Sequence, residues 1–261
     1  MASRRATTWC VALFSQAFGL GFILLVFPFL TAHPPLLRDL VWGGLAGIAG
    51  AAGIGFLYRG LAVGRMSVVS PITAVLAASL PVVWGSLHGE RPSFAALAGI
   101  ALALLAVVLV SAATDQAEGP AGVARIAPGV PAAILAGCGF GVLFIMLAQT
   151  SAQAGMWPLI GARLCSIPVL FGAALATRSV IVPPRGSFAS IALAGVLDMS
   201  ANVLYLLSLR YTILAIAAVV TSLYPASTVL LARVVLREYL NARQWCGVAC
   251  AGAGVVLIAL R

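Results

Sequence analysis

Long blocks of apolar residues, separated by short polar connections, run through the whole chain. Each block is about 20 residues long, the length that a helix needs to cross the roughly 30 Å hydrocarbon core of a bilayer. We predict nine such spans, at 8–30, 39–58, 66–88, 93–113, 129–150, 156–177, 187–209, 213–235 and 242–260. Inside a bilayer a helix satisfies its own backbone hydrogen bonds, and the short alternating segments of membrane strands are absent from the sequence. The pattern therefore predicts an all-α, polytopic membrane protein.

The composition agrees with a chain that lies almost entirely in lipid. Of the 261 residues, 62% are hydrophobic and only 8% are charged, and the mean hydropathy is +1.13. A soluble domain carries about 25% charged residues, so this chain has too few to cover a surface in water. We expect a multi-pass protein of the cytoplasmic membrane. Ser3, Arg4 and Arg5 lead directly into the first span, without the pattern of a cleavable signal peptide.

The net charge of +9 does not indicate a nucleic-acid partner. The basic residues stand singly or in pairs at the ends of the apolar blocks, where topology signals and contacts with lipid headgroups belong. We therefore expect the lipid bilayer as partner and no nucleic acid.

One connection is longer than the others and divides the chain into two halves. It covers 114–128 and carries Asp115, Glu118 and Arg125. We predict a first repeat at 1–113 with four helices, a linker at 114–128, and a second repeat at 129–261 with five helices.

The two halves carry an internal repeat. When the chain is shifted by 148 residues, 73–109 aligns with 221–257 without a gap. The informative identical pairs are Thr73 with Thr221, Ser79 with Ser227, Glu90 with Glu238, and Gly99 with Gly247. Because five spans separate equivalent helices, the second copy has the opposite orientation in the membrane. Inverted repeats around a shared site near the midplane are a recurrent plan of secondary transporters.

The motif residues resemble those of EamA-type transporters of the drug/metabolite transporter superfamily. In the second half these are the segment YLLSLR at 205–210, Pro225, Glu238, Gln244 with Trp245, and Gly247. In the first half Gly89, Glu90, Arg91 and Gly99 match, whereas the position of the family proline holds Ala77, with Pro81 nearby. The resemblance implies a structural role in the repeat for Glu90, Gly99, Pro225, Glu238 and Gly247.

The resemblance also implies ten helices, five in each repeat, whereas the pattern predicts nine. Arg163 resembles the family arginine in the second helix of a repeat, and Arg4 or Arg5 occupies the corresponding place in the first half. Met1 therefore falls just before the expected second helix. We expect either that the gene start is assigned too late or that the chain is a nine-helix variant.

The orientation in the membrane stays open. The family pattern places the C-terminus in the cytoplasm. The N-terminus and every second connection after it hold ten arginines, against four on the other side. The positive-inside rule then places the C-terminus outside.

A carboxylate inside the seventh span is the most informative residue. Asp198 lies among apolar residues, and an ionised carboxylate at bilayer depth costs about 2.5–3.5 kcal/mol on insertion scales. Asn202 and Tyr205 follow at i+4 and i+7, so the three side chains share one face of a helix. Two interpretations remain: a site for substrate, cation or proton, or a structural hydrogen bond to a neighbouring helix.

Other polar residues are weaker candidates. Arg163 would extend to the interface, pair with Asp198 or bind an anionic solute. Ser70, Ser222 and Tyr224 either line a cavity or serve packing. Glu90 and Glu238 stand at helix ends, where we expect each to cap the helix that follows. Prolines inside the spans, at positions 71, 81, 168 and 225, each remove an N–H donor and bend or break a helix.

The sequence contains no catalytic constellation. His33 and His88 are isolated, no metal-like cluster forms around the cysteines, and no phosphate-binding loop is present to drive transport with ATP. We expect no enzyme, no cofactor and no metal. By elimination we predict a secondary transporter, an exporter of a small metabolite or drug, with a coupled proton or cation at Asp198 as one option. The alternatives are a non-transporting membrane scaffold or assembly partner, and a membrane enzyme or lipid-handling protein. Substrate, coupling ion and oligomeric state stay open.

Overall fold

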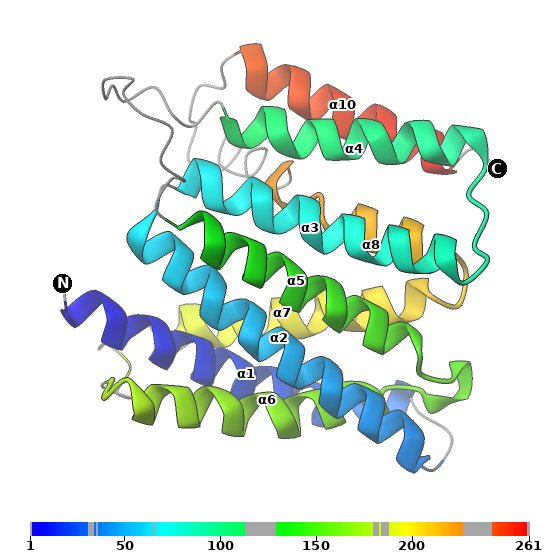
Figure 1. Ribbon diagram of the computed structural model, residues 1–261. Helices are drawn as coiled ribbons and strands as arrows, with labels where there is room; N and C mark the ends of the chain where they lie inside the picture. The colour runs from blue at the N-terminus through cyan, green and yellow to red at the C-terminus, as the bar shows by residue number, and fades with distance from the viewer. Residues whose placement is uncertain are drawn as a thin grey trace, which may run out of the picture. The chain divides into compact units, whose positions relative to one another are not determined.

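The computed structural model describes residues 2–30, 34, 36–64, 66–112, 129–179, 183, 188–226 and 242–259. The regular structure within these ranges is helical (Figure 1). The helices are α1 (Ala2–Leu30), α2 (Leu37–Val63), α3 (Met66–Leu87), α4 (Phe94–Ala112), α5 (Val130–Ala148), η1 (Ala152–Ala154), α6 (Trp157–Ala176), α7 (Phe188–Ser208), α8 (Leu214–Thr221) and α10 (Ala242–Ala259).

The helices match the apolar blocks closely. The five predicted spans from 66–88 to 187–209 coincide with α3 to α7 to within two residues. The α2 helix continues to Val63, five residues past the predicted end, because residues 59–63 contain no proline and Gly60 does not interrupt the helix. Among the described helices six are long and apolar enough to cross a membrane, namely α1, α2, α3, α5, α6 and α7. The prediction of an all-α, polytopic membrane protein is confirmed.

The eighth predicted span, 213–235, is not one continuous helix. The α8 helix ends at Thr221, Ser222 and Leu223 form a turn, and helical structure resumes at residues 224–226. Pro225 has no N–H to donate to the carbonyl of Thr221, so a helix through this point would lose a bond. Residues 227–241, and with them Glu238, lie outside the described residues.

The chain divides into two compact units, and neither coincides with a half of the sequence. The first unit contains residues 1–58 and 142–212, and the second contains residues 59–141 and 213–261. Each unit therefore combines helices from both predicted repeats. The predicted linker, 114–128, lies outside the described residues.

In the first unit, α1 runs antiparallel to α6 (Figure 1). The rings of Phe27 and Trp157 lie 4.6 Å apart at one end of this pair, and Ala12 packs with Leu170 toward the other end. The α1 helix also packs against α7, where Gly195 faces the backbone carbonyl of Ser15. The α1 helix therefore packs against both α6 and α7.

Glycine lets α2 lie directly against the backbone of α6. Gly43 and Gly47 face Pro158 and Ala162, and a Cβ added at Gly47 would lie only 2.7 Å from the Cα of Ala162. Lipid provides no hydrophobic drive for helix association, so membrane helices gain attraction from such close backbone contact. The glycine pair on α2 is therefore a packing surface for α6.

In the second unit, α3 runs antiparallel to α8, and α4 runs antiparallel to α10 (Figure 1). Small side chains form the contact between the first pair, with Ala74 and Ala78 of α3 in one buried cluster with Val219 of α8. In the second pair, a Cβ at Gly254 would lie 2.9 Å from the carbonyl oxygen of Gly99. Gly99, a predicted motif residue, is thus part of a helix contact.

The helices that pack in antiparallel pairs are counterparts in the predicted repeat. A shift of 148 residues relates α3 to α8 and α4 to α10, and the family pattern relates α1 to α6. Two copies of opposite orientation would pair in this way. The duplication and its boundaries stay a prediction.

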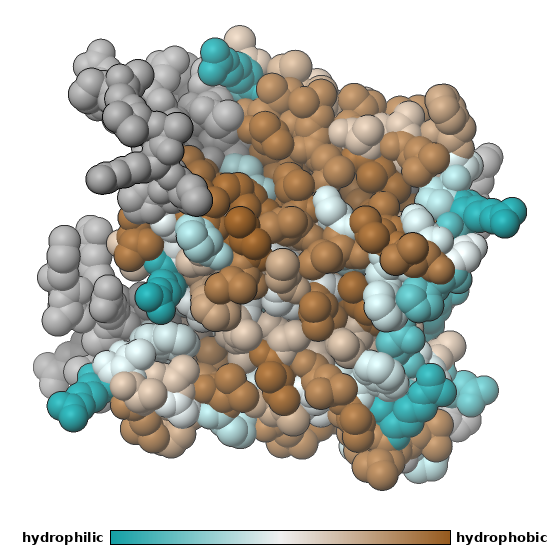
Figure 2. Space-filling view, viewed as in Figure 1, coloured by the Kyte–Doolittle hydropathy of each residue, from teal (hydrophilic) through white to brown (hydrophobic). Residues whose placement is uncertain are grey.

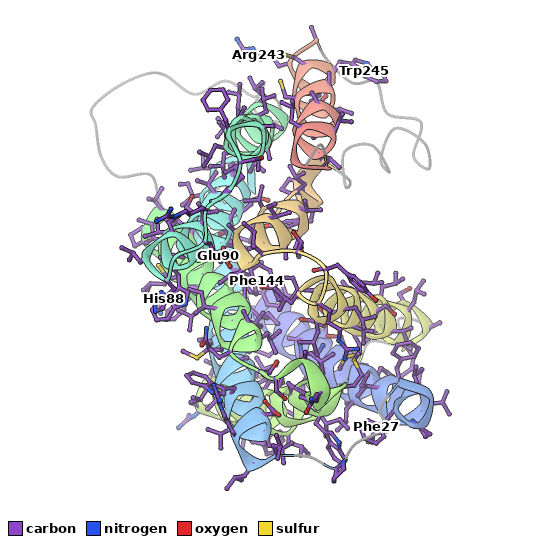
Figure 3. All side chains as sticks on the ribbon, turned by 90° about the vertical axis from the view of Figure 1, so that its right-hand side faces the viewer. Phe27, His88, Glu90, Phe144, Arg243 and Trp245 are labelled. Atoms are coloured by element: carbon purple, nitrogen blue, oxygen red, sulfur yellow. The ribbon has the colours of Figure 1, made fainter. Side chains whose placement is uncertain are left out.

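Glu90 caps α8, not the helix that follows it in the chain. Its two carboxylate oxygens accept hydrogen bonds from the backbone N–H of Leu214 (2.9 Å) and Ala215 (3.1 Å), beside the first turn of α8 (Figure 3). At α4 the backbone N–H of Ala96 donates to Ser93 Oγ instead (3.2 Å). The expected cap on α4 is therefore wrong. Gly89, at φ +91°, turns the chain just before Glu90, and Ser93 already occupies the capping position of α4.

Apolar side chains cover the outside of the helices. Figure 2 shows hydrophobic residues along the helices and hydrophilic ones gathered near their ends. On α7, Leu193, Leu197 and Leu204 are each more than half exposed. Exposed leucines in a row fit a surface that faces lipid chains.

Replacing Glu90 by Ala should destabilise the protein by about 1–2 kcal/mol, because two N–H groups at the start of α8 lose their acceptor. The measurement is the midpoint of thermal unfolding of the purified protein in detergent. Arg91→Ala is the matched control, since Arg91 is exposed and adjacent. Equal midpoints for the two variants would contradict the cap.

Replacing Gly47 by Ala should destabilise by about 1–3 kcal/mol, because the new methyl group overlaps the backbone of α6. Gly172→Ala is the control, since a Cβ at Gly172 meets no atom within 4 Å. We expect the same thermal assay to show a lower midpoint for Gly47→Ala only. If both variants unfold together, the α2–α6 contact is not as close as described.

Candidate functional site

A buried cluster of polar side chains joins three helices of the first unit. Arg163 of α6 donates from Nη2 to Asp198 Oδ2 of α7 at 2.6 Å, and from Nη1 to Gln16 Oε1 of α1. Ser166, one turn along α6, also donates to Gln16 Oε1, at 3.1 Å. One guanidinium group therefore links α6 to both of its neighbours.

Glycines bring the three helices close enough for these contacts. A Cβ at Gly19 of α1 would lie 3.2 Å from the carbonyl oxygen of Gly195 and 3.4 Å from Arg163 Nε. Larger residues at Gly19 or Gly195 would push α1 away from α7. The cluster thus depends on the small residues beside it.

The two charged groups of the cluster differ in exposure. The side chain of Arg163 is 9% exposed, whereas that of Asp198 is 48% exposed. The expectation that Arg163 extends to the interface is therefore wrong, and its pairing with Asp198, one of the alternatives, is what the structure shows. Charge-assisted hydrogen bonds to a carboxylate and an amide oxygen stabilise the guanidinium inside the protein, so the side chain does not extend to the interface.

The predicted stripe of Asp198, Asn202 and Tyr205 does not act as one group. Asn202 donates from Nδ2 to the backbone carbonyl of Asp198 at 2.8 Å. Tyr205 is buried, and its hydroxyl donates to the carbonyl of Phe144 at 3.0 Å, with the two rings 4.6 Å apart. Tyr205 therefore ties α7 to α5, while Asp198 presents the charge.

One further residue, Gln16, belongs to this site and was not among the predicted residues. It accepts hydrogen bonds from Arg163 and Ser166 of α6. A signal for Gln16 existed, because an amide in the middle of an apolar span is as unusual as a carboxylate.

The other three candidates lie in the second unit. Ser70 and Tyr224 form a side-chain hydrogen bond. Ser222 is buried at the turn after α8, and no residue in the described part of the chain forms a hydrogen bond with its hydroxyl. These residues belong to the α3–α8 region.

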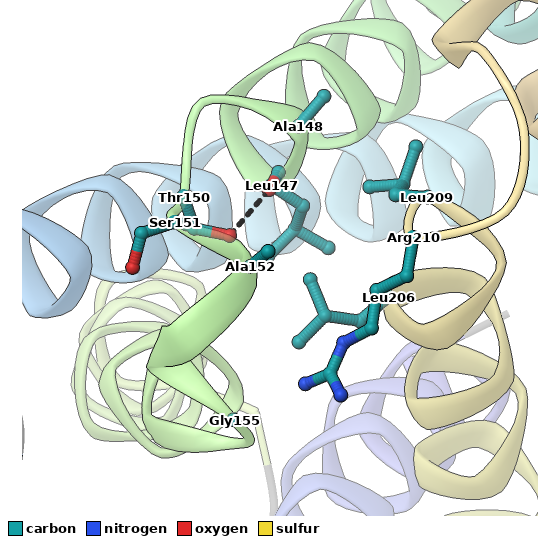
Figure 4. Close-up of a pocket in the computed structure, with 9 residues that line it drawn as sticks. All are labelled: Leu147, Ala148, Thr150, Ser151, Ala152, Gly155, Leu206, Leu209 and Arg210. Atoms are coloured by element: carbon teal, nitrogen blue, oxygen red, sulfur yellow. Dashed lines mark hydrogen bonds between the residues drawn. The ribbon is translucent and has the colours of Figure 1, made fainter. Parts of the chain in front are cut away.

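A small cavity at one end of the first unit contains none of the candidates. Its volume is about 80 Å³, room for about two or three water molecules. Arg210 extends beside it, and the hydroxyl of Thr150 at its wall donates to the carbonyl of Leu147 at 2.7 Å (Figure 4). Ser151, also in the wall, donates from its backbone N–H and its hydroxyl to the fully buried carboxylate of Asp39, both at 2.8 Å. The bonds to Asp39 hold the connection between α5 and α6 against α2.

Within the described ranges, no group of three His, Cys, Asp or Glu side chains is placed to hold a metal ion. The cluster around Arg163 offers one carboxylate and one amide oxygen, both already bonded to the guanidinium. Its chemistry is that of ion pairing and hydrogen bonding. Such groups can bind a solute or a proton.

Comparison with known proteins identifies the family. The model of the EamA-like transporter family matches residues 127–260, just over half of the chain. A crystal structure of a protein with 18% sequence identity superposes with a TM-score of 0.76, covering 97% of this chain and 89% of that chain. No curated protein matches in sequence. The chain therefore belongs to the EamA-like transporter family and is a multi-pass membrane transporter of the drug/metabolite type.

Proposed function

We propose that this chain is a secondary transporter that exports a small metabolite or drug across the cytoplasmic membrane, with the Arg163–Asp198–Gln16 cluster as its solute and coupling site. The observation that carries the proposal is the position of Asp198. It is the middle residue of α7 (Phe188–Ser208) and the one charged residue of this span, and it is half exposed. Ionisable residues at this depth usually serve substrate or ion pathways.

Stability alone does not explain the pair. Burying the guanidinium of Arg163 costs about as much as its attraction to the carboxylate returns, and apolar replacements of buried ion pairs are often neutral or stabilising. The chain has only six acidic residues, and the centre of a membrane span is an unfavourable position for one of them. A role in transport would explain why Asp198 is there.

The cluster is built to respond to a proton or a solute. When Asp198 is neutralised by a proton, Arg163 loses its ion pair on α7 and keeps Gln16 on α1. The contact between α6 and α7 is then weaker, while that between α6 and α1 persists. A ligand that binds the two arrangements unequally shifts their populations, which is how binding would be coupled to movement. We propose a proton as the coupled ion.

The proposed architecture is a pair of inverted repeats, 1–113 and 129–261, joined by the linker at 114–128. The antiparallel packing of α3 with α8, and of α4 with α10, supports it. Transport by inverted repeats proceeds through alternating access around a central site. Export as the direction is proposed from the family resemblance alone.

Replacing Asp198 by Asn should reduce pH-gradient-driven solute transport at least tenfold, because the uncharged amide neither takes up a proton nor holds Arg163 as an ion pair. The measurement is solute-coupled proton movement in proteoliposomes, with an internal pH indicator and a metabolite library. Asp198→Glu keeps the charge and should retain part of the activity. Arg178→Gln, on an exposed residue outside the helices, controls for the loss of one charge.

Full activity of Asp198→Asn would remove Asp198 from the mechanism. The absence of transport in the unsubstituted protein, with every solute tested, would favour the scaffold alternative. Correct insertion of each variant is checked by its monodisperse elution after purification.

The ion pair also predicts non-additive stability. Arg163→Gln leaves the carboxylate of Asp198 without its cation, and Asp198→Asn leaves a buried guanidinium without its anion. The double variant removes both charges and should unfold at a higher temperature than Arg163→Gln alone. Because Asp198 is half exposed, we expect a coupling of about 1–2 kcal/mol, reduced by solvent screening. Strictly additive shifts in the unfolding midpoint would show that the two groups do not interact.

A further inference from the structure

The unequal exposure of the Arg163–Asp198 pair determines which charge a solute meets first. The guanidinium lies behind the carboxylate, shielded by α1 and α6, and only the carboxylate is half exposed. An approaching molecule therefore encounters the negative end of the pair.

Arg163 offers little to an anionic solute, because its side chain is only 9% exposed. Nη1 already donates to Gln16 and Nη2 to Asp198. Nε has no hydrogen-bond partner among the described residues, but it is buried and lies against Gly19 of α1, where an added Cβ would be 3.4 Å away. A carboxylate or phosphate would have to displace a helix to reach it.

Two oxygen atoms beside the pair are available as acceptors. Asp198 uses Oδ2 for Arg163, and no described residue donates a hydrogen bond to its other oxygen, Oδ1. Asn202 donates one N–H of its amide to the carbonyl of Asp198, and no described residue donates to its side-chain oxygen. Both residues lie on one face of α7, one turn apart. The site thus offers two oxygen acceptors close together, one of them on a charged group.

We propose that the transported solute carries a protonated amine, which binds Asp198 Oδ1 and the side-chain oxygen of Asn202. An ammonium group has three N–H donors and a positive charge, which fits a carboxylate oxygen beside an amide oxygen. The proposal rests on the proposed function, since it names the solute class of the same site.

The positive charge of Arg163 does not cancel this attraction. A cation hydrogen-bonded to Oδ1 would be about 3 Å from the carboxylate and about 6 Å from the guanidinium behind it, and Coulomb energy falls as the inverse of distance. The attraction therefore exceeds the repulsion about twofold. An anion at the same place would be repelled by the same margin, so the site selects cations over anions.

The test compares three molecules that share a benzyl or phenyl group and differ in charge: benzylamine, benzyl alcohol and benzoate. Binding to the purified protein in lipid nanodiscs is measured at pH 7 as the rise in the unfolding midpoint with ligand concentration. Hexylamine, hexanol and hexanoate form a second matched set without an aromatic ring. Each set is also measured with Asp198→Asn. Effects of the ligands on the lipid shift the unfolding midpoints of both proteins, so the difference between the two proteins reports binding at Asp198.

We expect the two amines to raise the midpoint, the alcohols to act more weakly, and the carboxylates to have no effect. Asp198→Asn should weaken amine binding at least tenfold, and Asn202→Ala should weaken it about threefold. Asp198→Glu should retain binding. Loss of binding in Asp198→Asn through misfolding is detected because that variant would then also fail to elute as a single species.

Three results would overturn the proposal: no amine raises the midpoint, a carboxylate binds as well as its amine, or amine binding survives in Asp198→Asn. None of them would by itself refute the proposed transport function, which depends on Asp198 in the proteoliposome assay whatever the charge of the solute. Conversely, amine binding without any coupled proton movement would support the site and refute the coupled transporter.

Discussion

A bilayer contains no water to satisfy polar groups, so each donor and acceptor at membrane depth needs a partner within the protein. This constraint explains why the described chain is helical and why its carboxylates are placed as they are. Glu90 accepts the first N–H groups of α8, and Asp39 accepts both donors of Ser151. Each carboxylate joins segments more than 100 residues apart in the chain. Charged residues are few here, and these two carboxylates hold distant segments together.

The same constraint makes small residues necessary. A guanidinium can link α1, α6 and α7 only where the three backbones lie close, and Gly19 and Gly195 provide that distance. Gly43 and Gly47 bring α2 against α6 in the same way. Glycine weakens an isolated helix, but in lipid the gain from backbone contact outweighs this cost. Close packing at these small residues therefore places the guanidinium within reach of its partners on α1 and α7.

The function that we propose for the cluster depends on its asymmetry. Two buried charges that neutralise each other would be a structural tie, whereas here one member is shielded and the other is half exposed. The exposed carboxylate can exchange partners while the guanidinium stays in place with Gln16. A tie between helices that a proton or solute can release is the physical requirement for coupling binding to movement. Tyr205, by contrast, is bonded to α5 and holds α7 whatever happens at Asp198.

The sequence alone determined which segments lie in the membrane and which residues are out of place there. Hydropathy over about 20 residues is a local property, so the spans from α3 to α7 were correct to within two residues, and Asp198 was recognised as unusual. It did not determine the partners. Asp198 pairs with a residue 35 positions away, and Arg163 reaches Gln16 over 147 positions. Glu90 was assigned to the adjacent helix because chain order was the only guide, whereas the structure turns it onto α8. Partner choice and exposure depend on how helices pack, and packing is a property of the whole fold.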